Sequence, residues 1–218
     1  MSTENTTRRI EEIGIIPVVR ATSFEEARNA VDAICAGGIP VIEITMTVPD
    51  APRLIRDLVH HFGERVLTGA GTVINLKQAE ICLDAGAKFL VSPGLVLPVL
   101  HAAAKRSVLA IPGALTPTEV IAALEAGANL IKIFPCGSAG GTKYLKALKA
   151  PFPGVRFIPT GGVNLSNAAE YIEEGAFALG VGAELVNLTA LRQNEPEKIV
   201  ESAKAFVNAV RHARAKTK

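Results

Sequence analysis

Short apolar stretches alternate along the chain with longer stretches whose apolar residues recur at helical spacing. The apolar stretches predict eight strands, at residues 13–20, 41–45, 66–69, 89–92, 108–111, 130–134, 155–160 and 177–181. The longer stretches predict eight helices, at residues 23–36, 50–61, 75–85, 95–105, 116–126, 139–149, 165–174 and 195–213. Strands that alternate with helices are typical of parallel sheets, so the pattern indicates an α/β fold.

Small-residue turns containing glycine end several of the predicted helices, for example Ala85-Gly86-Ala87 and Ala126-Gly127-Ala128. Eight strand–helix units in 218 residues leave about 27 residues per unit, which suits a small (β/α)₈ barrel, the TIM barrel. A doubly wound open sheet is the alternative, but no G-x-G-x-x-G follows the first strand. We therefore predict one barrel domain over residues 1–218, with a polar N-terminal extension and a C-terminal helix packed on the barrel.

Composition narrows the class of protein. Hydrophobic residues make up 49% and charged residues 20%, which is typical of a globular chain. A net charge of +2 argues against nucleic acid as a partner. No apolar run reaches the roughly 20 residues of a membrane span, and the polar N-terminus does not resemble a signal peptide. Three widely spaced cysteines fit a reducing compartment, so we expect a cytoplasmic protein with no membrane partner.

Lys132 is the most informative residue, because it lies within the apolar strand 130–134. A lysine is seldom buried without a partner or a function. Burial disfavours the charged ammonium and favours the neutral amine, which can attack a carbonyl carbon. The alternative is a lysine paired with a carboxylate for support alone.

Glu43 is the second candidate, in the strand 41–45. Side chains alternate between the two faces of a strand, so Ile42 and Ile44 should face the helices and Glu43 should point into the barrel. An inward glutamate near a strand end is a candidate general acid/base. A structural pair with Lys132 is again the alternative.

Other polar or small residues follow the strands, where barrel enzymes hold their substrates. Thr160-Gly161-Gly162 and the loop at Gly182 resemble phosphate-binding turns, since glycine lets backbone N–H groups approach an anion; tight corner turns are the alternative. Arg20 suits a carboxylate or phosphate, or is a solvated strand-end arginine.

Thr72 and Pro93 can shape a pocket for a small acid, although each is also a common structural residue. The histidines His60, His61, His101 and His212 all fall in predicted helices. We therefore expect no metal site and no cofactor, and the partner is a small-molecule substrate.

Several motifs together resemble one enzyme family. They are I-E-I-T at 42–45, G-A-G-T at 69–72, V-S-P-G at 91–94, I-P-G-A-L-T-P-T-E at 111–119, I-K-I-F-P at 131–135 and F-I-P-T-G-G-V at 157–163. The family is the class I 2-keto-3-deoxy-6-phosphogluconate (KDPG) aldolases, also called 4-hydroxy-2-oxoglutarate (KHG) aldolases. The resemblance covers about residues 10–210.

The resemblance implies a carbon–carbon lyase of the Entner-Doudoroff type that assembles as a homotrimer. It implies that Lys132 forms a Schiff base with the substrate and that Glu43 is the general acid/base. It further implies a pyruvate pocket lined by Thr72, Pro93 and Thr160, and a phosphate site at Gly161, Gly162 and Gly182.

Two positions depart from some members of the family. Thr47 stands where some members have an arginine for the substrate carboxylate, so Arg20 is a candidate for that task. Ala183 stands where some have serine, so the phosphate would depend more on backbone N–H groups.

Other functions remain open at this point. The 6-phosphogalactonate analogue of KDPG differs only in stereochemistry at C4. A phosphate-binding isomerase or epimerase barrel would need no imine, and a catalytically silent barrel would need neither Lys132 nor Glu43.

Overall fold

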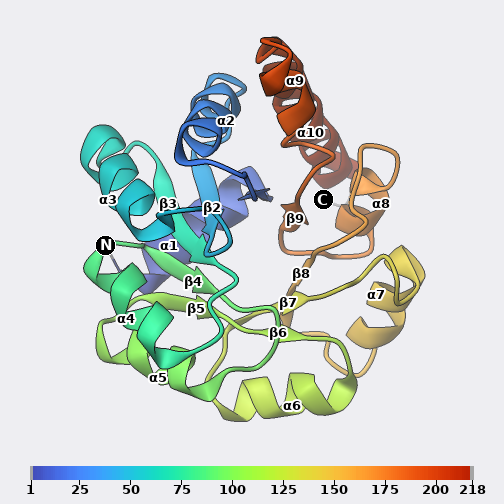
Figure 1. Ribbon diagram of the computed structural model, residues 1–218. Helices are drawn as coiled ribbons and strands as arrows, with labels where there is room; N and C mark the ends of the chain where they lie inside the picture. Colours follow the sequence, from blue (N-terminus) through green and yellow to red (C-terminus); the bar gives the residue numbers. More distant parts are fainter. Residues whose placement is uncertain (1, 217–218) are drawn as a thin grey trace.

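The computed structural model describes residues 2–216. The strands are β1 (Ile15–Val19), β2 (Val41–Thr45), β3 (Leu67–Gly71), β4 (Phe89–Val91), β5 (Leu109–Ile111), β6 (Gly113–Ala114), β7 (Leu130–Ile133), β8 (Arg156–Pro159) and β9 (Leu179–Val181). The helices are α1 (Thr3–Ile13), α2 (Phe24–Ala36), α3 (Ala51–Phe62), α4 (Leu76–Asp84), α5 (Leu97–Lys105), α6 (Pro117–Glu125), α7 (Gly141–Lys149), α8 (Ala168–Glu173), α9 (Leu188–Arg192) and α10 (Glu197–Lys216). Helices surround the strands (Figure 1).

All strand pairs are parallel, and the strands form a curled α/β arrangement. Six strands pair in the order β5-β4-β3-β2-β1-β9, and three pair in the order β6-β7-β8. Pro112 alone separates β5 from β6 along the chain. At the other border a parallel bridge joins Thr160, just after β8, to Gly180 of β9. The two sheets therefore adjoin at both borders, and the predicted α/β class is confirmed.

Alternating residues of each strand divide between two cores, as a period of two requires. Val41 and Leu130 belong to an inner cluster enclosed by the strands. Their neighbours Ile42, Ile44 and Ile131 belong to a larger cluster between the strands and the helices. Because Glu43 and Lys132 alternate with the outward residues, both lie on the inner face.

The predicted helices are present, with ends shifted by a few residues. Ser23, Asn75 and Thr116 cap α2, α4 and α6, and each side chain accepts a hydrogen bond from a backbone N–H of the first turn. The last helix packs as its periodicity predicts, since Ile199 and Phe206 of α10 are fully buried.

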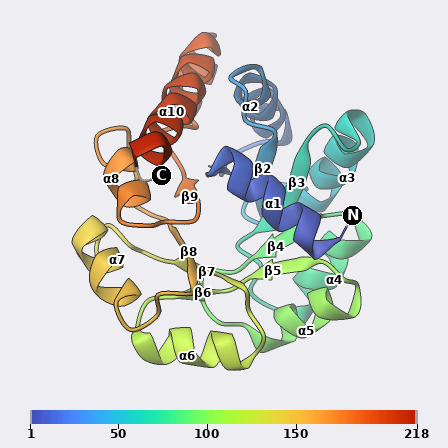
Figure 2. The same ribbon diagram turned by 180° about the vertical axis from the view of Figure 1, so that it is seen from behind.

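The predicted polar extension at the N-terminus contains a helix that was not predicted, α1 at residues 3–13. The predicted first strand is correspondingly too long: Ile13 ends this helix and Gly14 caps it in the left-handed conformation. Only Thr6 and Ile10 of α1 are buried, which is too sparse a pattern to indicate a helix. Ile10 joins the inner cluster, so α1 covers the amino-terminal end of the strands (Figure 2).

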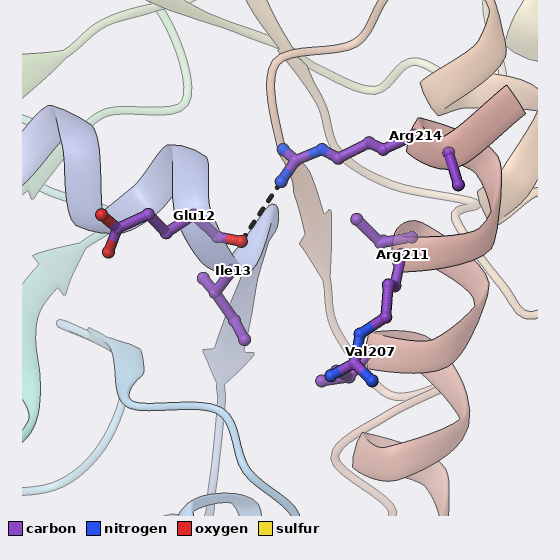
Figure 3. A pocket seen from close by; sticks show the side chains of 7 residues that line it. Glu12, Ile13, Val207, Arg211 and Arg214 are labelled. Carbon is purple, nitrogen blue, oxygen red and sulfur yellow. Dashed lines mark hydrogen bonds between the residues drawn. The ribbon is translucent and has the colours of Figure 1, made fainter. Parts of the chain in front are cut away.

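The C-terminal helix α10 contacts α1 through hydrogen bonds from Arg214. Arg214 donates hydrogen bonds to the carbonyl of Glu12 at 3.2 Å and to that of Phe177 at 3.0 Å. Figure 3 shows this arginine reaching from α10 to α1 across a cavity of about 400 Å³. The amino-terminal end of the sheet is thereby covered, and the carboxyl end is left for binding.

Candidate active site

Glu43 and Lys132 are the buried charged residues of the inner face. Glu43 is 2% exposed and Lys132 is 6% exposed. They come from β2 and β7, which belong to different sheets. An amine nucleophile near a carboxyl group that gives or takes a proton is the pairing that carbonyl condensation requires.

Burial raises the pKa of the Glu43 carboxyl above its ordinary value of 4.5, although the positive charges of Lys132 and Arg20 oppose this shift. Within residues 2–216 no group hydrogen-bonds its Oε1 atom. A buried carboxylate oxygen without a partner is costly, so these surroundings favour the protonated form of Glu43. A raised pKa suits a carboxyl group that has to donate a proton as well as accept one.

A cavity of about 630 Å³ opens at the carboxyl end of the strands. Six of the predicted site residues line it, namely Arg20, Lys132, Thr160, Gly161, Gly162 and Gly182. They come from β7 and from the segments after β1, β8 and β9, which are far apart in sequence. The structure thus brings the candidate nucleophile and the candidate phosphate-binding glycines to one cavity.

The glycine turn after β8 has the backbone geometry that glycine alone adopts readily. Gly161 and Gly162 have φ values of 84° and 79°. The Gly161 carbonyl accepts a hydrogen bond from the Gly137 N–H at 2.8 Å. The Gly162 carbonyl accepts one from Asn167 Nδ2 at 2.9 Å. With both carbonyl groups bonded to neighbouring segments, the turn is held in a fixed shape at the cavity wall.

Thr72 and Pro93 follow β3 and β4 at the same end of the sheet, but they do not line this cavity. Thr72 is half-buried and has a φ of 57°, an uncommon conformation for a β-branched residue. Such strain occurs preferentially at functional sites. Pro93 packs closely on Gly113, where a Cβ would lie 2.2 Å from the Pro93 carbonyl oxygen.

Thr47 is exposed, and its hydroxyl pairs with that of Thr45 at 2.7 Å. The Thr45 hydroxyl donates to the Val19 carbonyl at 3.1 Å, so it accepts from Thr47. Thr47 therefore places a short hydroxyl group at the position where an arginine would have a long, positively charged side chain.

Sequence reasoning missed several residues that line the cavity. Phe134 packs beside the amine, with Lys132 Nζ 5.2 Å from its ring centroid. Thr22 and Arg192 also line the cavity wall. The motif I-K-I-F-P gave a signal for Phe134. Arg192 gave none, because it ends the five-residue helix α9 in a stretch with no clear periodicity.

The histidines and other candidate metal ligands lie apart. His60 and His61 lie in α3, His101 in α5 and His212 in α10. Among the described residues no group of three or more His, Cys, Asp or Glu side chains could hold a metal ion. No helix in this part of the chain is both long and apolar enough to cross a membrane.

Comparison with known protein families decides which family this chain belongs to. The family model for KDPG and KHG aldolase matches residues 6–202. The chain belongs to the KDPG and KHG aldolase family. It is therefore an aldolase, a carbon–carbon lyase, and the resemblance seen in the motifs is confirmed.

Individual members of the KDPG and KHG aldolase family are similar along most of the chain. The KHG/KDPG aldolase of Escherichia coli strain K12 is 34% identical over 90% of this chain and 92% of its own. The 2-dehydro-3-deoxy-6-phosphogalactonate aldolase of the same strain is 34% identical over 93% and 97%. The crystal structure of Legionella pneumophila KDPG aldolase is 35% identical, with a TM-score of 0.85 over 92% of this chain and 97% of that one. That crystal contains pyruvate captured as a covalent carbinolamine.

Proposed function

We propose that this protein is a class I aldolase. It reversibly cleaves KDPG to pyruvate and glyceraldehyde 3-phosphate, and it also cleaves 4-hydroxy-2-oxoglutarate to pyruvate and glyoxylate. The observation that carries the proposal is the buried amine of Lys132, which opens on the cavity and shares the inner face with Glu43. The pyruvate carbinolamine in the Legionella relative supports the same chemistry here.

In the first step the neutral amine of Lys132 attacks the C2 ketone of the substrate. The electron pair of the carbonyl moves to oxygen, and the amine proton is passed to that oxygen, giving a carbinolamine. Protonated Glu43 then donates its proton to the departing hydroxyl, so water leaves and an iminium forms on Lys132. Because burial raises the pKa of Glu43, the carboxyl group keeps this proton at a higher pH than an exposed glutamate would.

Cleavage uses the carboxylate that the first step leaves behind. Glu43 removes the proton of the C4 hydroxyl, directly or through a water. The C4 oxygen forms a carbonyl, the C3–C4 bond breaks, and its electron pair moves to the iminium to give an enamine. Glyceraldehyde 3-phosphate leaves, the enamine takes a proton at C3 from Glu43, and hydrolysis of the iminium releases pyruvate and the free amine.

The remaining site residues hold the substrate. Arg20 is the candidate for binding the substrate carboxylate, because it lines the cavity. Its positive charge also reaches the site, since it opposes the rise in the pKa of Glu43 that burial causes. Thr72, Pro93 and Thr160 shape the pyruvate end. Backbone N–H groups at Gly161, Gly162 and Gly182 are the proposed contacts of the phosphate. No metal and no cofactor takes part in this scheme.

A second candidate substrate is the 6-phosphogalactonate analogue of KDPG. A relative of that name is as similar to this chain as the KHG/KDPG aldolase is, at 34% identity. The two substrates differ at C4, the carbon whose hydroxyl Glu43 deprotonates. Cleavage rates measured on both phosphates therefore decide between them.

We further propose that the two sheets form one closed (β/α)₈ barrel and that residues 1–218 are a single domain. The bridge between Thr160 and Gly180 supports closure of the barrel.

We also propose that the protein is a homotrimer in the cytoplasm. Large apolar side chains exposed on α4 and α6, including Ile81 and Ile121, support an interface between subunits. Three free cysteines fit a reducing compartment. Light scattering of the purified protein tests the trimer.

Borohydride reduction in the presence of pyruvate, followed by peptide mass spectrometry, tests the proposed function. We expect a pyruvyl adduct on Lys132, its loss in Lys132→Ala, and slower but detectable trapping in Glu43→Gln. Absence of an adduct from the folded wild type would overturn the Schiff-base mechanism. Near-wild-type cleavage by both variants would do the same.

A further inference from the structure

We propose that Arg192 binds the phosphate group of the substrate and sets the preference for phosphorylated aldehydes. The inference rests on the proposed aldolase function. Arg192 ends helix α9 and lines the same cavity as Gly161, Gly162 and Gly182. No motif of the sequence assigns it a function.

Two partners fix the guanidinium group of Arg192. Its Nε donates to Glu26 Oε1 at 2.7 Å, and its Nη2 donates to Thr22 Oγ1 at 3.4 Å. Thr22 and Arg192 are both residues of the cavity wall, whereas Glu26 holds them from α2. The arginine is therefore attached to the wall at its Nε edge.

The anchor is itself firmly held. The other carboxylate oxygen of Glu26 accepts hydrogen bonds from the Thr22 N–H at 2.8 Å and the Thr22 hydroxyl at 2.9 Å. The Glu26 side chain is 10% exposed. Burial alone would raise its pKa, but the bonds from Arg192 and Thr22 outweigh burial and lower the pKa. Glu26 is therefore ionised at neutral pH, and its ion pair with Arg192 persists.

The anchoring bonds leave donors for a ligand. A guanidinium carries five N–H groups. Among residues 2–216 the side chain of Arg192 uses two of them, with Glu26 and Thr22. Three N–H groups remain on a cation whose position is already set, so little conformational entropy is lost when an anion binds.

The charges of the cavity point to phosphate. Arg192 is the third cation of the wall, beside Lys132 and Arg20, while Glu184 is the acidic residue of the lining. Lys132 must be uncharged to attack, and Arg20 suits the carboxylate. Arg192 is therefore the cation of the lining that is left for a phosphate dianion at the glycine turns, where Ala183 offers no hydroxyl. Arginine is the side chain best matched to phosphate geometry.

A purely structural ion pair between α2 and α9 is the alternative. A pair of that kind would support the fold alone and would not discriminate between substrates. The two functions therefore predict different kinetics for the same variant.

The test is aldol addition of pyruvate to two acceptors that differ only in the phosphate, glyceraldehyde 3-phosphate and glyceraldehyde. For Arg192→Gln we expect kcat/KM with the phosphorylated aldehyde to fall about 10- to 100-fold, the range for loss of a charge-assisted hydrogen bond. The unphosphorylated aldehyde should react as fast as with the wild type. Inhibition by inorganic phosphate should weaken in parallel, and Arg192→Lys should be intermediate.

Arg106→Gln is the matched control. The Arg106 side chain is 49% exposed and pairs with Asp84 at 2.7 Å, much as the Arg192 side chain is 54% exposed and pairs with Glu26. Because Arg106 does not line this cavity, Arg106→Gln should leave both reactions unchanged. Equal losses with both aldehydes, or no loss with either, would overturn the inference while the wild type remains an aldolase. A wild type that adds pyruvate to neither aldehyde would instead refute the proposed function.

Discussion

The carboxyl group of Glu43 occupies the space that a side chain at residue 71 would fill. A Cβ placed on Gly71 would lie 1.9 Å from Glu43 Oε1 and 2.5 Å from its carboxyl carbon. Gly71 ends β3, directly beside Thr45 of β2 in the sheet register. The absence of a side chain at Gly71 therefore creates the position in which the proposed acid/base is held.

Gly71→Ala should displace the carboxyl group and lower kcat, because a methyl group and Glu43 Oε1 cannot share this space. We expect a loss of about 10²–10⁴-fold, the usual contribution of a general acid/base. The pH profile of kcat should change as well, since the displaced carboxyl lies at different distances from the positive charges of Lys132 and Arg20. Steady-state cleavage of KDPG between about pH 5 and 9 measures both effects.

The double variant Gly71→Ala/Glu43→Asp separates positioning from folding. Aspartate is one methylene shorter and leaves room for the added methyl group. We expect it to regain part of the activity lost by Gly71→Ala, although Glu43→Asp alone lowers activity. If Gly71→Ala keeps full activity, Gly71 does not position Glu43.

The strand periodicity was enough to predict which face Glu43 occupies. Alternation depends only on neighbours in the chain, and Ile42 and Ile44 fix it for β2. The fit of Gly71 against Glu43 could not be predicted, although Gly71 lies in a recognised motif. It depends on the register between two strands, which one sequence does not specify.

Two helices were not predicted because too few of their residues are buried to give a helical spacing of apolar positions. Helix α1 has only Thr6 and Ile10 buried, and α9 is five residues long with Ala190 buried. Arg192 was missed for the same reason, and because Glu26 is 166 residues away along the chain. Ion pairs between such distant residues leave no signal in local spacing.

Glu43→Gln should make the protein more stable at neutral and alkaline pH. Burial raises the pKa of Glu43 in the folded state above the 4.5 of the unfolded chain. The folded state thus binds the proton more tightly, so wild-type stability falls as pH rises from 4.5 through the folded-state pKa. Glutamine carries no charge and avoids this loss.

Urea unfolding of both proteins at about pH 5 and about pH 8 measures this effect. The stability advantage of Glu43→Gln should be larger at the higher pH. A difference that is the same at both values would show that Glu43 titrates alike in the folded and unfolded chains.

Gly14→Ala should lower the free energy of unfolding more than Gly127→Ala does. Gly14 has a φ of 70°, and an added Cβ would lie 2.7 Å from Arg214 Nη2 and 2.8 Å from Val210 Cγ1. The backbone conformation costs about 1–2 kcal/mol, and overpacking costs about 1–3 kcal/mol more. Gly127 is the matched control, because its φ is 84° and an added Cβ there would meet no atom within 4 Å. Gly127→Ala should show the backbone cost alone in thermal or urea unfolding, and equal losses would contradict the packing of α10 on α1.

Arg20→Gln should move the pH profile of catalysis in a defined direction. The positive charge of Arg20 opposes the raised pKa of Glu43, so its removal raises that pKa further. The alkaline limb of kcat/KM reports the free enzyme and requires protonated Glu43 for dehydration of the carbinolamine, so it should shift to higher pH. Because Arg20 lines the cavity, the pyruvate concentration needed for half-maximal borohydride trapping should also rise. Arg8→Gln removes the same charge from α1, where the Arg8 side chain is 66% exposed, and should leave both measurements unchanged. An unshifted limb in Arg20→Gln, with pyruvate trapping at the wild-type concentration, would place the substrate carboxylate on another residue.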